Sequence, residues 1–130
     1  MAAPRDGGTD HLLKYGGEEN IIPNDSQVFY SEYADLGILK WEEISVDSDR
    51  VEINYEEIDW NASYARLGGV GLLNMGYAYT EINADSDQVA LVSSQQVGRF
   101  YVNGRGYQGE PYYANYQRVA VPLQKGINRI

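Results

Sequence analysis

The feature that most constrains the fold is the alternation of short β-like runs with turn residues from position 27 onward. Turn signals recur about every 8–12 residues, and no apolar pattern with the 3.6-residue period of a helix extends between them. The runs are rich in Val, Ile, Tyr and Phe, which favour strands, and Gly, Asn, Asp and Ser bound them. This spacing is typical of an all-β sandwich or barrel.

The run pattern predicts mainly antiparallel strands at residues 28–30, 37–41, 44–46, 51–55, 76–82, 88–93, 97–102 and 118–123, and a further strand from 127. Residues 88–93 are the most continuously apolar, which predicts a central strand. Asn103-Gly104 predicts a tight hairpin turn, because both residues tolerate positive φ. Residues 59–65 are irregular and have room for one helical turn.

A chain of 130 residues with 43% hydrophobic residues is long enough to form one domain with an ordinary core. Residues 1–26 are rich in Gly, Asp, Glu, Asn and Pro, with apolar clusters only at 11–13 and 21–22. We therefore expect a loosely ordered N-terminal arm over 1–26, followed by a β-sandwich domain over 27–130.

Charge excludes two classes of partner. The net charge is −9, so the chain repels nucleic-acid phosphates and anionic membrane surfaces, and no apolar run approaches the length of a membrane span. Of 19 acidic residues, 18 lie at or before Asp87, whereas five of ten basic residues lie from Arg99 on. Two explanations are open. Either strands from the acidic and basic parts of the sequence pair, so that their charges compensate, or the basic residues from Arg99 on form a ridge that contacts a partner. The absence of cysteine excludes disulfides and thiolate metal sites.

The last 55 or so residues carry a recognisable pattern. Val102-Asn103-Gly104 is followed by Val121-Pro122-Leu123-Gln124-Lys125-Gly126-Ile127-Asn128-Arg129-Ile130, and Gly76-Tyr77-Ala78-Tyr79 precedes both. This pattern resembles the jelly-roll, galactose-binding-like modules that accompany bacterial secreted hydrolases of the prolyl-oligopeptidase or glycoside hydrolase type. The residues themselves have structural roles, since Gly126 permits a turn and Asn128 can bond neighbouring backbone.

The resemblance implies a jelly-roll β-sandwich that is non-catalytic and serves domain packing or positioning. It also implies a hydrolase catalytic domain C-terminal to this chain, and a secreted or periplasmic location. The first residues show no signal-peptide pattern, so we expect the chain to begin after a removed signal. The apolar strand starting at 127 reaches the last residue, Ile130, and we expect it to be truncated there.

Catalytic motifs are absent from the sequence. The single histidine, His11, lies in the N-terminal arm and is expected to be solvated, and no Gly-x-Ser-x-Gly elbow occurs. Adjacent acidic pairs such as Glu42-Glu43 do not place two carboxylates across a cleft, because neighbours in a strand face opposite sides. A free-standing enzyme is therefore the least favoured reading.

Asp85 and Asp87, in an Asp-Ser-Asp turn, resemble half of a calcium loop. Calcium needs six to eight oxygen ligands, and the Gly and terminal Glu of an EF-hand are missing. The alternative is a plain turn in which an aspartate bonds backbone. A structural calcium ion is the only cofactor that the sequence leaves open.

A loop over 107–116, rich in tyrosine, is the strongest candidate for a binding surface. Its candidate residues are Tyr107, Tyr112, Tyr113, Tyr116, Arg105 and Asn115. Exposed tyrosines beside polar groups suit a protein interface, and they equally suit the C–H faces of sugar rings. The third reading is a long loop packed down by its own tyrosines. The sequence thus predicts a domain-packing module or, alternatively, a carbohydrate-binding module that holds polysaccharide.

Overall fold

The computed structural model describes residues 11–30, 37–46, 61, 65, 76–112, 114 and 116–130. The chain divides into two compact units, one of residues 1–14 and 22–78 and the other of residues 15–21 and 79–130. A 3-10 turn, η1 (Leu13–Tyr15), lies where the chain passes between them. The strands of the described residues pair only in antiparallel fashion, so the all-β prediction is confirmed for them. No helix in this part of the chain is long and apolar enough to cross a membrane.

The first unit contains β1 (Val28–Tyr30) and β2 (Ile38–Lys40), at the positions predicted from the sequence. Phe29 and Leu39 oppose each other in the register and are almost completely buried, as is Leu12. The Trp41 ring meets the Phe29 ring edge-on at 6.1 Å between centroids, and its indole N–H donates to Gln27 Oε1 at 2.6 Å. The buried Gln27 amide also donates to the Ile22 carbonyl oxygen at 3.0 Å.

Two expectations for this unit fail. His11 is only 7% exposed, so the prediction of a solvated side chain is wrong. Residues 41–46 contain no strand, and Ile44 and Val46 are 46% and 56% exposed. Alternation over three residues is too short to specify a strand without a pairing partner. The predicted strand at 51–55 lies outside the described residues.

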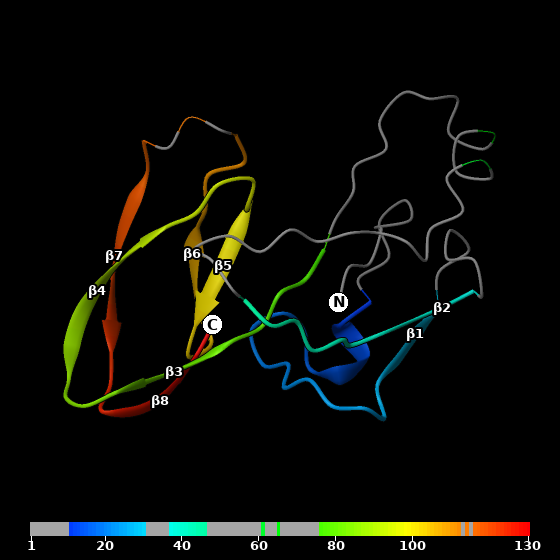
Figure 1. Cartoon of the computed structure of the whole chain (residues 1–130), viewed down its shortest axis with the longest axis horizontal. Helices are drawn as coiled ribbons and strands as arrows, with labels where there is room; N and C mark the ends of the chain where they lie inside the picture. Colours follow the sequence, from blue (N-terminus) through cyan, green and yellow to red (C-terminus); the bar gives the residue numbers. More distant parts are fainter. Residues whose placement is uncertain are drawn as a thin grey trace. The chain divides into compact units, whose positions relative to one another are not determined.

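The second unit is built on a long antiparallel ribbon that is folded at a corner (Figure 1). One arm is β3 (Glu81–Ala84) followed by β4 (Gln88–Ser93), and the other is β7 (Arg118–Leu123) followed by β8 (Gly126–Arg129). β3 pairs with β8 and β4 pairs with β7. β5 (Arg99–Val102) and β6 (Arg105–Gln108) form a hairpin between the arms in sequence.

The core of this unit lies between the inner face of the β4–β7 ribbon and the hairpin. Its buried residues are Ala84, Val102, Val121 and Leu123, with Ala90, Val92, Phe100, Tyr107, Val119 and Ile130 packed against them. The outer face of β4 is open, because Val89 and Leu91 are 70% and 69% exposed. The prediction that 88–93 is a central strand is therefore wrong within the described residues, where β7 is its only neighbour.

Two asparagines join the hairpin turn to the ribbon. Asn103 and Gly104 have φ values of 50° and 79°, as predicted for the turn. Asn103 Nδ2 donates to Oδ1 of Asn128 at 2.9 Å, and the Arg129 N–H donates to Asn103 Oδ1 at 2.9 Å. Asn128 is fully buried, and its amide also donates to the carbonyl oxygens of Gln124 and Gly126 at 2.8 and 2.9 Å. The predicted backbone-bonding role of Asn128 is confirmed.

Strand pairing also answers the question raised by the charge distribution. In the described residues, β3 from the acidic part of the sequence pairs with β8 from the basic part, as expected if strands from the two parts compensate each other's charge. Within the second unit, Arg129 Nε lies 3.4 Å from Glu81 Oε1, which also accepts the Tyr79 hydroxyl at 2.7 Å. Burial, and then the hydrogen bond to Glu81, raise the pKa of Tyr79 above 10.0.

Candidate functional site

The segment that joins β6 to β7, residues 109–117, contains most of the predicted site and is here called the tyrosine loop. It leaves β6 alongside the segment that precedes β5. The Val97 N–H donates to the Glu110 carbonyl oxygen at 3.0 Å, and the Gly109 N–H donates to the Gly98 carbonyl oxygen at 3.2 Å. A Cβ at Gly109 would lie 2.1 Å from the Val97 carbonyl oxygen, so only glycine fits this crossing.

Glu110 organises the tyrosine loop from inside. Its side chain is 6% exposed, and its carboxylate accepts the backbone N–H groups of Ala114 and Tyr116, the latter at 3.2 Å. Its own N–H donates to Ser94 Oγ at 3.3 Å. Hydrogen bonds from backbone to a buried carboxylate are stronger than neutral ones. The loop backbone is therefore held in place by Glu110.

The predicted aromatic residues divide into two groups. Tyr112 and Tyr116 are 74% and 90% exposed, so neither ring packs the loop down. Tyr107 instead lies in β6 and stacks on Phe100, with 5.4 Å between ring centroids. The guanidinium of the exposed Arg105 lies 5.4 Å from the Tyr107 ring centroid. Tyr113 and Asn115 lie outside the described residues.

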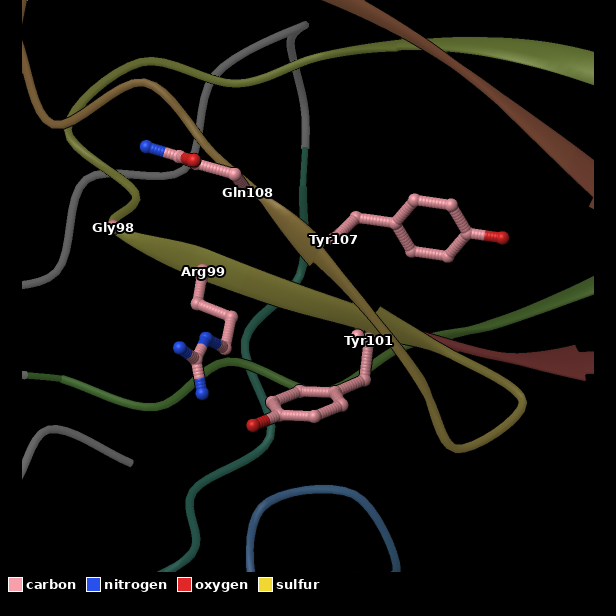
Figure 2. A pocket seen from close by; sticks show the side chains of 6 residues that line it. Gly98, Arg99, Tyr101, Tyr107 and Gln108 are labelled. Carbon is pink, nitrogen blue, oxygen red and sulfur yellow. The ribbon is translucent and has the colours of Figure 1, made fainter.

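A second feature was not predicted. Six residues of the β5–β6 hairpin line an open groove of about 430 Å³: Gly98, Arg99, Tyr101, Gly106, Tyr107 and Gln108. Figure 2 shows Arg99 and Tyr101 side by side along β5, with the Tyr107 ring directed away from both. Arg99 and Tyr101 alternate along β5 with Phe100 and Val102, which pack in the core, so they lie on the opposite face of the strand, where they line the groove.

Hydrogen bonds connect the groove to an acidic residue. The Tyr101 hydroxyl donates to Glu18 Oε2 at 3.3 Å. A side-chain hydrogen bond with Tyr101, followed by the charge of Tyr101 and of Glu18, raises the pKa of Arg99. Because an arginine side chain stays protonated, the Arg99 guanidinium is a permanent cation at the groove.

The two candidate calcium ligands, Asp85 and Asp87, lie between β3 and β4 at the corner of the ribbon. They belong to neither the groove nor the tyrosine loop. Asp87 Oδ1 accepts the Lys125 N–H at 2.7 Å, which fixes one arm of the ribbon to the other. Asp85 is exposed. Among the residues that the structure describes, no three His, Asp or Glu side chains gather into a group suited to a metal ion.

Two functional features escaped the sequence prediction. Glu110 was not among the predicted site residues, although it is the only acidic residue after Asp87 and lies inside the aromatic segment. The groove depends on Gly106 opposing Tyr101, a pairing that follows from the two-residue turn at Asn103-Gly104. The hairpin register could therefore have been derived from the sequence, whereas the hydrogen bonds of Glu110 could not.

Comparison with known proteins adds no relative: no protein-family description, no curated protein and no solved structure matches this chain.

Proposed function

We propose that this chain is a non-catalytic accessory module of a larger secreted hydrolase, and that the tyrosine loop docks it on the neighbouring catalytic domain. The observation that carries the proposal is the exposure of Tyr112 and Tyr116 on a backbone fixed by the buried Glu110. Tyrosine is enriched in the energetically dominant contacts of protein interfaces. A loop ordered before binding loses less conformational entropy when it docks.

The proposed architecture is a jelly-roll β-sandwich of the galactose-binding-like kind. The folded ribbon of β3–β4 and β7–β8 supports this proposal, because jelly rolls are wound from long antiparallel pairs. The direct contact between Asn103 and Asn128 supports it too, since these residues come from the two parts of the sequence pattern that resembles those modules. A location outside the cytoplasm, in the periplasm or the medium, is part of the same proposal.

The docking proposal is tested in the complete natural polypeptide that contains this chain. Replacing both Tyr112 and Tyr116 with serine should separate the unfolding of the module from that of the neighbouring domain, because docked domains unfold together. Calorimetry would then show two transitions where the wild type shows one. Tyr30→Ser is the matched control, since Tyr30 is 71% exposed but lies in the first unit. Unchanged unfolding of the double variant would contradict docking through this loop.

Carbohydrate binding through the same loop is the second candidate, and the exposed rings of Tyr112 and Tyr116 favour it equally. A glycan array probed with the wild-type chain and with the double serine variant separates the two functions. Glycan binding that the variant loses would replace the docking proposal. Binding that the variant retains would place a sugar site elsewhere on the chain.

A further inference from the structure

We propose that Asn103 is a site of spontaneous deamidation, and that its two side-chain hydrogen bonds slow the reaction while the second unit is folded. The site lies in the turn between β5 and β6, outside the tyrosine loop, so it is independent of the docking function. Asn103-Gly104 is the only Asn-Gly pair in the sequence. Asparagine deamidates fastest when glycine follows it, because no side chain then hinders the attacking backbone nitrogen.

The reaction closes a ring within the chain. Solvent hydroxide removes the proton of the Gly104 backbone N–H, and this nitrogen attacks Cγ of Asn103. The bond between Cγ and Nδ2 breaks, and Nδ2 takes up a proton from water and leaves as ammonia, so that a succinimide remains. One water molecule then opens the ring at either carbonyl, which leaves aspartate or isoaspartate at position 103. The net change is the hydrolysis of an amide, so no oxidant, reductant or cofactor takes part.

The turn presents both reacting residues to solvent. Asn103 and Gly104 are exposed, and both have the positive φ of a tight hairpin turn. The paired residues of the hairpin end at Val102 and Arg105, so the Gly104 N–H lies beyond the last pair of the ladder. Water and hydroxide therefore reach both the attacking nitrogen and the amide that it attacks.

Two hydrogen bonds hold the Asn103 amide against this reaction. Nδ2 donates to Oδ1 of Asn128 at 2.9 Å, and Oδ1 accepts the Arg129 N–H at 2.9 Å. Departure of Nδ2 breaks the first bond, and moving Cγ toward the Gly104 nitrogen draws Oδ1 away from the second. The net contribution of one hydrogen bond corresponds to a factor of about five in an equilibrium constant. The two bonds together should slow deamidation about 25-fold.

Deamidation would change this contact irreversibly. Both side-chain oxygens of an aspartate at position 103 are acceptors, so neither donates to Oδ1 of Asn128. Asn128 cannot turn its amide over without loss, because Nδ2 already donates to the carbonyl oxygens of Gln124 and Gly126 at 2.8 and 2.9 Å. Isoaspartate adds a backbone atom to the turn that sets the hairpin register. Either product therefore weakens the link between the hairpin and the ribbon.

The test compares deamidation in the folded chain with that in the same chain unfolded in guanidinium chloride, at one pH and temperature. Peptide mass spectrometry follows the replacement of NH2 by OH, and electron-transfer fragmentation separates isoaspartate from aspartate. We expect the product at position 103 in both samples, formed about 25-fold more slowly in the folded chain. Asn83 is the internal control, because alanine follows it, and it should react much more slowly than Asn103 in guanidinium.

Variants at Asn128 test the restraint itself. Asn128→Ala removes the acceptor of the Asn103 Nδ2 bond and should speed deamidation of the folded chain about fivefold. Asn128→Asp loses the amide donors but keeps an acceptor for Asn103, so its rate should stay within about twofold of wild type. Asn83→Ala, at an exposed position on β3, is the matched control and should leave the rate unchanged. The amide spectrum shows whether each variant is folded, and the wild-type comparison decides where one is not.

Three results would overturn the proposal. The first is an equal rate at position 103 in the folded and unfolded chains, which would mean that the hydrogen bonds restrain nothing. The second is a folded-chain rate at Asn103 no higher than at Asn83. The third is equal acceleration by Asn128→Ala and Asn128→Asp when both are folded. As a check on the consequence, Asn103→Asp reproduces one product and should shift the unfolding equilibrium of the second unit about fivefold toward the unfolded state.

Discussion

Replacing Asn128 with alanine should destabilise the second unit more than any other polar substitution in the ribbon. Asn128 is fully buried, and its side chain accepts hydrogen bonds from Asn103 Nδ2 at 2.9 Å and from the Gln124 N–H at 2.8 Å. It donates two more, to the carbonyl oxygens of Gln124 and Gly126. At about 1 kcal/mol for each bond, the loss is about 4 kcal/mol. That is a large part of a typical total stability of about 5–15 kcal/mol.

The measurement is amide hydrogen exchange across a urea series, read at β4 and β7 so that only the second unit reports. Asn83→Ala is the control, because Asn83 is an exposed asparagine on β3, and the expected change is within about 0.5 kcal/mol. A loss below about 1 kcal/mol for Asn128→Ala would refute the reasoning, since it would mean that the buried amide contributes no more than one ordinary hydrogen bond.

A double-mutant cycle isolates the contact between the two asparagines. Asn103→Gly removes the side chain and is chosen instead of alanine because glycine adopts the positive φ of 50° at this position more readily. We expect a coupling energy of about 1 kcal/mol between Asn103→Gly and Asn128→Ala, corresponding to their one direct bond. Strict additivity would show that the two side chains act independently.

Three further predictions concern the tyrosine loop and alkaline pH. Gly109→Ala should lower the free energy of unfolding in urea by at least about 3 kcal/mol, because its Cβ would lie 2.1 Å from the Val97 carbonyl oxygen. Gly98→Ala is the control: its Cβ would meet nothing within 4 Å, so the free energy of unfolding should change by less than about 1 kcal/mol. Glu110→Gln keeps the shape of the side chain but not its charge, so we expect a loss of about 2 kcal/mol and faster exchange of the two amides that it holds; unchanged exchange would show that the carboxylate does not restrain the loop. Because burial and the bond to Glu81 raise the pKa of Tyr79, the folded state holds this proton longer than the unfolded state. The contribution of Tyr79 to the free energy of unfolding should be fully present below pH 10.0 and should be lost as the pH rises through the folded pKa. Tyr79→Phe should remove this pH-dependent contribution. Tyrosinate absorbance follows the titration, and urea unfolding at each pH follows the stability.

The sequence predicted the elements whose information is local. The strands at 88–93 and 118–123 have the predicted bounds, and the Asn103-Gly104 turn has the predicted backbone, because alternation and turn chemistry act between near neighbours. The strand expected from 76 begins only at Glu81. A continuous apolar run does not indicate how many strands lie beside it. Residues 88–93 were therefore predicted to form a central strand, although one face of this strand is exposed.

The candidate site was predicted in part for the same reason. The hairpin turn fixes the register that brings Tyr107 opposite Phe100, so the packing of this ring into the core could have been derived from the sequence. The role of Glu110 could not have been derived in this way, because its hydrogen bonds to the loop backbone follow no sequence period. The contact between Asn103 and Asn128 joins positions 25 residues apart and depends on how the ribbon folds.

The most direct test of the central claim is hydroxyl-radical footprinting of the tyrosines in this chain alone and in the complete natural polypeptide. Docking through the tyrosine loop predicts that Tyr112 and Tyr116, 74% and 90% exposed here, become several-fold less reactive in the complete polypeptide. Tyr30, 71% exposed and in the first unit, should keep its reactivity. Equal reactivity of Tyr112 and Tyr116 in both samples, or a natural polypeptide without a neighbouring domain, would contradict the account.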